Sequence, residues 1–179
     1  MAAVSAVAAA VSDPGTWRAA DIDSILLQGD VVHCERLAEL GWPSVRVTKE
    51  LAVDELPDTI VFRHCSVNVR ASICTSNDQE YFLSHNIQHN LSNIIAGSQY
   101  RSTIVRQNDA SYGIHKSTLS CHIYLFDSHA VEQKFAGLLR FDSAHELAAY
   151  LAHKVKGRRP QQIDCVPIQV QVDAVIDVT

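Results

Sequence analysis

An aspartate and a histidine stand two residues apart at the end of an apolar run, in the segment Tyr124-Leu-Phe-Asp127-Ser-His129. The run is typical of a strand, and because strand side chains alternate between faces, Asp127 and His129 project to the same side. A carboxylate in that position can fix the tautomer of the imidazole and stabilise the imidazolium that forms when the histidine acts as a base. A surface loop with two solvated side chains is the alternative interpretation of this short motif.

A histidine base of this kind needs a nucleophile, and the cysteines do not supply an evident one. They are Cys34, Cys65, Cys74, Cys121 and Cys165. A reactive thiolate is favoured at a helix N-terminus, where the helix dipole lowers the thiol pKa. The sequence instead predicts one cysteine inside a helix, three in strands and one in the C-terminal segment, so each is expected to be a small buried hydrophobe. Their odd number and the lack of CxxC spacing argue against a disulfide framework and favour reduced thiols inside the cell.

A pair of histidines, His85 and His89, has the i, i+4 spacing of zinc ligands on a helix. The general-base glutamate of the HExxH motif is replaced by Asn86, and no clear third ligand follows. Polar positions on an amphipathic helix explain the pair better, so we expect no metal and no cofactor. The sequence also lacks the glycine patterns of nucleotide-binding loops and of nucleophile elbows.

The composition is that of one ordinary globular domain. The chain has 179 residues, of which 47% are apolar and 20% are charged. Its net charge of −5 argues against a nucleic-acid partner, and no apolar run approaches the roughly 18 residues of a membrane span. The alanine-rich start lacks the basic residues and the strongly apolar core of a secretory signal. We therefore expect an intracellular, cytoplasmic protein that binds neither nucleic acid nor membranes.

Hydrophobic periodicity predicts helices first, then strands with one helix among them, then a final helix. The expected helices span residues 1–11, 19–27, 30–40, 82–96 and 144–156, with a break at Gly29-Asp30 and a capping box of Ser143 and Glu146 before the last one. The expected strands span residues 59–69, 72–75, 100–106, 112–115, 121–126 and 138–141. This order predicts an α+β fold with a largely antiparallel sheet packed against helices. Residues 158–179 are expected to form a tail or an added strand beyond a domain at 1–157.

The first expected helix has two unusual properties. Six of its first ten residues are alanine, which favours a helix and allows close packing inside a domain. It also begins at residue 1 without a capping residue before it. A buried helix that lacks a preceding segment indicates that the sequence given begins partway into its domain.

Several segments, taken in their order, resemble the deubiquitinating cysteine peptidases at the N-terminal end of herpesvirus large tegument proteins. The similar parts are the helix after the nucleophile, a helix pair ending in Gly-Asp, a loop before the first strand, the Asp-x-His motif and the final helix. They correspond here to residues 2–8, 17–33, 55–57, 126–129 and 147–151, so the resemblance covers residues 1–156. The family's usual Gly-Asp-x-Leu-Tyr reads Gly29-Asp30-Val31-Val32-His33 in this chain.

This resemblance implies a papain-like fold and hydrolysis at the C-terminus of ubiquitin by a Cys-His-Asp triad. His129 would be its base and acid, and Asp127 would orient the ring. In the family the cysteine follows Gly-x-Gln, with the glutamine as an oxyanion donor, and the alignment places Met1 where that cysteine belongs. A thioether has no ionisable proton and cannot replace a thiolate, so the sequence as given is expected to be inactive. It would be either a truncated active peptidase, which the missing cap favours, or a pseudoenzyme.

Three functions therefore remain open from the sequence. The first is a deubiquitinase-like cysteine peptidase whose nucleophile is missing from this chain. The second is a non-catalytic module on the same fold that binds ubiquitin or a ubiquitin-like protein. The third is an unrelated α+β binding domain in which Asp127 and His129 are incidental.

Overall fold

The computed structural model describes residues 1–41, 51, 55–64, 67–75, 80–83, 87–107, 110–131, 135–155 and 162–177. Its helices are α1 (Ala2–Val11), α2 (Ala19–Glu39), α3 (Ile87–Gly97) and α4 (Ala144–Val155), with a short 3-10 turn, η1 (Pro14–Thr16), after α1. Its strands are β1 (Thr59–His64), β2 (Val67–Thr75), β3 (Glu80–Leu83), β4 (Ser102–Gln107), β5 (Ala110–Lys116), β6 (Ile123–Val131), β7 (Phe135–Phe141) and β8 (Gln162–Asp177). The α+β fold class expected from the sequence is confirmed.

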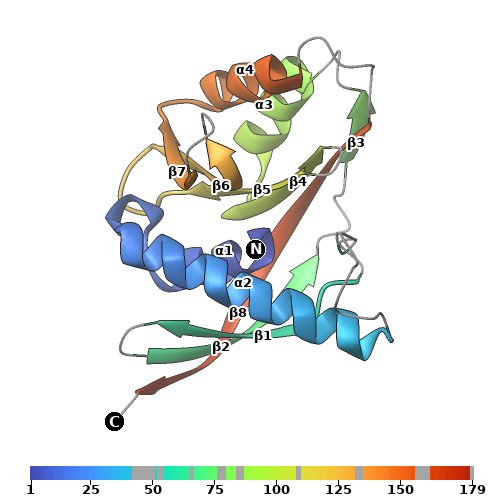
Figure 1. Ribbon diagram of the computed structural model, residues 1–179. Coiled ribbons are helices and arrows are strands. Elements are labelled where there is room, and N and C mark those ends of the chain that lie inside the picture. Colours follow the sequence, from blue (N-terminus) through green and yellow to red (C-terminus); the bar gives the residue numbers. More distant parts are fainter. Residues whose placement is uncertain are drawn as a thin grey trace.

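The strands of the described residues form a single eight-stranded sheet in the order β1-β2-β8-β4-β5-β6-β7, with β3 also paired to β8. Every pair is antiparallel. The long last strand, β8, joins β1 and β2 on one side to β4 on the other, and Figure 1 shows it running through the middle of the molecule. The last described segment of the chain is therefore an integral part of the sheet.

Two hydrophobic cores lie on opposite faces of this sheet. One packs α3 and α4 against strands β4 to β8, and the other packs α1 and α2 against β1, β2, β4, β6 and β8. Neighbouring residues of β4 show the division, because Ile104 belongs to the second core and Val105 to the first. Strand alternation thus lets one strand serve both cores.

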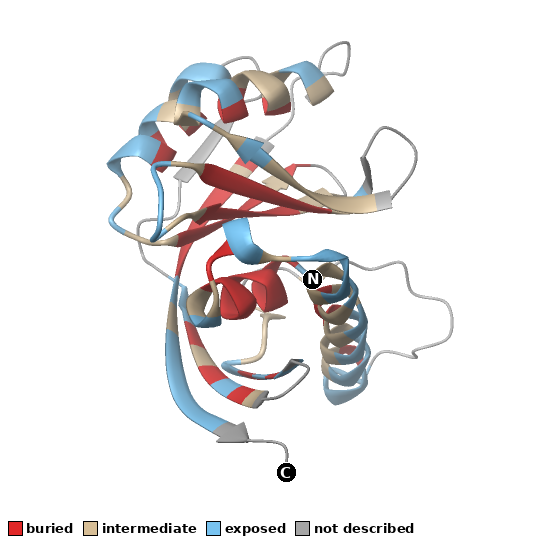
Figure 2. Cartoon of the chain, turned by 90° about the vertical axis from the view of Figure 1, so that its left-hand side faces the viewer, coloured by how far each residue is buried: buried red, intermediate tan, exposed pale blue. Residues whose placement is uncertain are grey.

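Helix α1 is the buried centre of the second core (Figure 2). Its residues 2 to 9 are all buried, and it contacts α2 and the five strands β1, β4, β5, β6 and β8. Small alanine side chains allow this close approach on every side. The expected alanine-rich buried helix is therefore confirmed.

A buried histidine of the sheet anchors α1. His115 of β5 is fully buried, and its Nε2 lies 2.9 Å from Ser5 Oγ of α1, while its Nδ1 lies 3.0 Å from Ser102 Oγ of β4. The Ser5 hydroxyl donates to the Ala2 carbonyl at 2.7 Å, so it accepts a hydrogen bond from the Nε2–H of a neutral ring. Burial, with a smaller contribution from the positive charge of Arg101, lowers the pKa of His115 to about 3.

A buried carboxylate fixes the turn that follows α1. One oxygen of Asp13 caps η1 by accepting from Gly15 N at 2.9 Å, and the other accepts from Thr118 N at 2.6 Å and Ser117 Oγ at 2.8 Å. Burial acts to raise the pKa of Asp13, but these hydrogen bonds outweigh it and lower the pKa to about 2. The end of α1 is thereby tied to the loop between β5 and β6.

Three expectations about elements were wrong. Helix α2 is continuous through Gly29-Asp30, because a single helical glycine costs only about 1 kcal/mol and tertiary packing outweighs it. The expected strand over residues 59–69 is divided between β1 and β2, which pair as neighbours. Phe82 and Leu83, expected to begin a helix, lie in β3, and α3 begins at Ile87.

The last helix agrees with its prediction. Helix α4 spans Ala144–Val155, and Ser143 Oγ accepts a hydrogen bond from Glu146 N at 3.2 Å. The Glu146 carboxylate accepts from Asp142 N at 3.0 Å, one residue before the position that a capping box uses. Among the described helices, none is both long and apolar enough to cross a membrane.

Candidate active site

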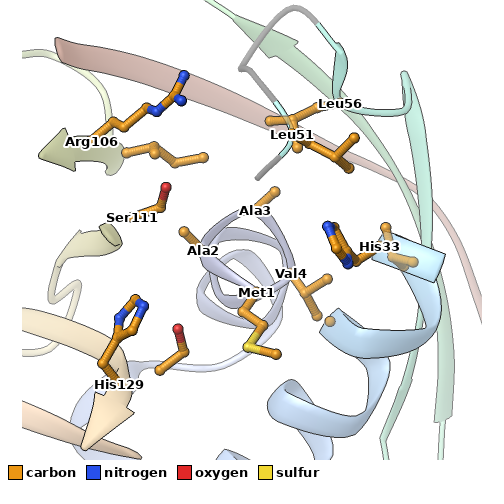
Figure 3. Close-up of a pocket in the computed structure, with 14 residues that line it drawn as sticks. Met1, Ala2, Ala3, Val4, His33, Leu51, Leu56, Arg106, Ser111 and His129 are labelled. Atoms are coloured by element: carbon orange, nitrogen blue, oxygen red, sulfur yellow. The ribbon is translucent and has the colours of Figure 1, made fainter. Parts of the chain in front are cut away.

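A pocket of about 240 Å³ opens at the N-terminus of α1. Figure 3 looks onto this end of the helix, with His129 on one side, His33 on the other and Met1 between them. The residues that line the pocket come from α1, α2, the segment before β1, and strands β4 to β6. They are Met1, Ala2, Ala3, Val4, Gly29, Val32, His33, Leu51, Leu56, Ile104, Arg106, Ser111, Ser128 and His129. The pocket thus has an apolar floor with two imidazoles and one guanidinium at its edges.

The two residues of the Asp-x-His motif lie together at the end of β6. Asp127 Oδ1 accepts a hydrogen bond from the backbone N of His129 at 2.9 Å and lies 3.2 Å from His129 Nδ1. The side chain of Asp127 is fully buried, whereas that of His129 is 49% exposed. A buried carboxylate therefore holds one nitrogen of the imidazole and leaves Nε2 available for proton transfer.

Met1 lies at the N-terminal end of α1, called here the head of the helix, and lines the same pocket as His129. It is the N-cap residue and makes no side-chain capping hydrogen bond. The first backbone N–H groups of α1 and the positive end of its helix dipole therefore point towards this part of the pocket. This is the environment that lowers a thiol pKa, although the side chain at this position here is a thioether.

The close approach of α2 to Met1 depends on a glycine. A Cβ added at Gly29 would lie 2.6 Å from Met1 Cγ and 2.8 Å from Met1 Cα. Real Cβ atoms essentially never come this close to a backbone atom, so a side chain at this position must displace the start of α1. Gly29 thus sets the distance between α2 and the head of α1.

Gly29→Ala is expected to destabilise the fold by about 1–3 kcal/mol, because the overlap outweighs the helix propensity that alanine adds. Urea unfolding measures this free energy. Gly97→Ala at the end of α3 is the matched control, since its Cβ would meet nothing within 4 Å. Equal or greater stability of Gly29→Ala relative to the native chain would contradict the close contact.

Two pocket residues were not predicted from the sequence as parts of the site. His33 comes from α2 and Arg106 from β4. In the sequence, His33 stands at the end of the Gly-Asp pattern, where the resemblance places a tyrosine. Arg106 is a polar residue in an otherwise buried strand, which is the one local signal that it faces an opening.

The cysteines lie elsewhere. Cys34 on α2, Cys74 on β2 and Cys121 before β6 are exposed, so the expectation that they are buried was wrong, whereas Cys165 on β8 is buried as expected. Cys65 lies outside the described residues. None of the four described cysteines lines the pocket at the head of α1.

The histidine pair with the spacing of zinc ligands lies partly outside the described residues, which include His89 but not His85. His89 is exposed on α3, and its Nε2 lies 3.2 Å from Asn93 Nδ2. Over the described ranges, no cluster of three or more histidine, cysteine or acidic side chains could hold a metal ion.

The fold defines a class. A helix buried against one face of an antiparallel sheet, with two helices on the other face, is here an α+β fold of the papain-like kind. The structure of the ubiquitin-specific protease encoded by a murine cytomegalovirus tegument protein, solved in complex with a ubiquitin-based suicide substrate, has this fold. It superimposes with a TM-score of 0.72 at 13% sequence identity and covers 96% of this chain and 76% of that protein chain.

The family of the chain follows from its match to a family sequence model. Residues 1–170 match the N-terminal conserved region of herpesvirus tegument proteins. The chain therefore belongs to this family, as the resemblance of its motifs indicated. No curated protein sequence matches the chain.

Proposed function

We propose that the pocket at the head of α1 is the site of a deubiquitinase-like cysteine peptidase domain. His129 is its base and acid, Asp127 orients the ring, and position 1 is the place of the nucleophile. The observation that carries the proposal is that Met1 and His129 line one pocket, while Asp127 lies 3.2 Å from the ring of His129. In a Cys-His-Asp triad the histidine lies between the nucleophile and the aspartate, and His129 would take this place between position 1 and Asp127.

The chemistry follows from these positions. A thiolate at position 1 would attack the carbonyl carbon of the last ubiquitin residue, and the protonated His129 would give its proton to the departing amine. Water, deprotonated by His129, would then attack the thioester and release the ubiquitin carboxylate together with the thiolate. The dipole of α1 would stabilise the thiolate, and Asp127 Oδ1, bonded to the backbone N and Nδ1 of His129, would hold the imidazole in place.

Methionine at position 1 interrupts this scheme. Its thioether carries no proton and forms no thioester, so the chain as given is expected to bind substrate without cleaving it. A non-catalytic module that binds ubiquitin or a ubiquitin-like protein is therefore the second candidate function, and the presence of Met1 in the pocket favours it. Both candidates share the partner and place the protein in the cytoplasm, where ubiquitin conjugates occur.

The test is the Met1→Cys variant, released from a cleavable leader so that cysteine occupies position 1. We expect ubiquitin–coumarin hydrolysis by this variant and none by the native chain or by the matched control Met1→Ala. The oxyanion donor that the resemblance places before position 1 is missing from the variant. The rate should therefore be about 10²–10³-fold below that of a complete site.

The possible outcomes separate the candidate functions. Hydrolysis by Met1→Cys supports the peptidase proposal. Ubiquitin binding by the native chain, measured by calorimetry, without hydrolysis by Met1→Cys, would favour the binding module. Absence of both would overturn the two candidates together and leave an unrelated binding domain.

A further inference from the structure

The buried carboxylate of Asp127 has two oxygens with different partners. Oδ1 is taken by His129, through its backbone N at 2.9 Å and its Nδ1 at 3.2 Å. Oδ2 lies 2.5 Å from Nζ of Lys154, a residue of α4. The Asp-His pair is thus extended by a cation from a different element, which packs against the other face of the sheet from α1.

Lys154 is held in this position on several sides. Its side chain is 27% exposed, and its Nζ lies 5.2 Å from the ring centres of both Tyr112 on β5 and Tyr150 on α4. Burial acts to lower the pKa of Lys154, but the hydrogen bond and charge of Asp127, with the two tyrosines, outweigh it and raise the pKa. The ammonium therefore stays charged throughout the pH range in which a histidine titrates.

A fully buried carboxylate without a cation is costly, because desolvation removes several kcal/mol of hydration that only a close partner can offset. Loss of the Lys154 side chain would take away the cation that is hydrogen-bonded to Oδ2 of Asp127. The carboxylate would then turn to satisfy both oxygens with the donors that remain, so Oδ1 would no longer be fixed at the ring of His129. Among the described residues, the titratable groups around Asp127 include His129 on β6, Tyr112 on β5, and Tyr150 and Lys154 on α4.

The geometry points to Lys154 as a positioning residue of the Asp127–His129 pair, which holds Oδ2 of the carboxylate and keeps Oδ1 directed at the imidazole. The value of this arrangement for catalysis rests on the function proposed above. The arrangement itself does not, because it concerns only contacts within the chain. Helix α4 thereby fixes the orientation of a carboxylate whose partner, His129, reaches the pocket on the opposite side of the sheet.

The experiment is a nitrogen NMR measurement of the neutral His129 ring in the native chain, Lys154→Met, Lys154→Arg and Arg140→Met. The shifts of the two ring nitrogens report which of them carries the proton. The native ring is expected to carry it on Nδ1, facing Asp127, whereas Lys154→Met should show a mixture of the two tautomers and Lys154→Arg should restore the native signal. Arg140, exposed on β7, is the matched control for loss of a positive charge away from Asp127, and its variant should give the native signal.

An unchanged His129 tautomer in a folded Lys154→Met chain would overturn the inference and reduce Lys154 to a structural partner of Asp127. If that variant does not fold, Lys154→Ala provides the same test with a smaller side chain. The measurement needs neither substrate nor turnover. Failure of Met1→Cys to hydrolyse ubiquitin–coumarin would therefore leave its result standing, and an unchanged tautomer would leave the proposed function standing.

Discussion

Replacement of His129 by alanine in the Met1→Cys chain is expected to lower ubiquitin–coumarin hydrolysis by at least ~10³-fold. His129 would both generate the thiolate and protonate the departing amine, so its loss removes two steps at once. Its side chain is half exposed and reaches the pocket, so truncation should leave the fold intact. The initial rate of coumarin release, measured on equal concentrations of folded protein, gives the factor.

Asp127→Asn in the same background separates orientation from proton transfer. It keeps an oxygen near the ring but loses the charge that stabilises the imidazolium, so a smaller loss than that of His129→Ala is expected. Thermal unfolding controls for the buried position of Asp127. If the His129→Ala chain retained the rate of its Met1→Cys parent, the assignment of His129 would fail.

A second large effect is expected on stability rather than activity. His115 is fully buried, and burial lowers its pKa to about 3, whereas the unfolded chain binds a proton at this side chain below about 6.5. Between these two pH values the unfolded state holds one proton more than the folded state, so acid favours unfolding. As far as His115 is concerned, the free energy of unfolding is highest above pH 6.5 and falls as the pH drops towards 3. We expect the chain to lose about 3 kcal/mol of unfolding free energy between pH 7 and pH 4.5 from this residue.

Urea unfolding at several pH values between 7 and 4.5 measures this loss. Protonation of Asp13 also lowers the free energy of unfolding, but because its pKa is about 2 this loss occurs mainly below pH 4. The matched control is His115→Gln, which is less stable at pH 7 because its hydrogen bonds to Ser5 and Ser102 are disturbed, but whose stability should fall less with acid. If the unfolding free energy of the native chain and of His115→Gln fell equally with acid, a neutral, buried His115 would be contradicted.

Elements with a clear local pattern were predictable from the sequence. The alanine-rich run of α1 and the capped amphipathic α4 were both expected within a residue of their observed bounds. The β-branched and apolar runs of β4 to β7 were also expected as strands, although β6 extends further than its apolar residues. In these segments the local propensity and the tertiary packing favour the same structure.

The remaining elements depend on contacts that local patterns do not record. Gly29 is compatible with a continuous α2 because Met1 packs against it. Phe82 and Leu83 have helical spacing with the residues that follow, but their pairing with Ile163 and Gln162 of β8 places them in a strand. Apolar and polar residues alternate only weakly over residues 166–178, so the sequence left a strand and a tail as alternatives. In the structure, β8 pairs with three other strands in the middle of the sheet.

The site shows the same division. Asp127 and His129 were found from the sequence because they lie two residues apart on one strand. Lys154 contacts Asp127 from α4, and His33 and Arg106 reach the pocket from α2 and β4. They lie far along the chain from the motif, so no local spacing linked them to it. Met1 was linked to the site only through the resemblance to the tegument family.

The most direct test of the account is covalent labelling of the Met1→Cys chain by ubiquitin with an electrophile at its C-terminus, followed by peptide mass spectrometry. The account predicts one ubiquitin bound at position 1, much slower labelling when His129 is also alanine, and no labelling of the native chain. Labelling of an exposed cysteine such as Cys34 or Cys121, at equal rates with methionine or cysteine at position 1, would contradict it.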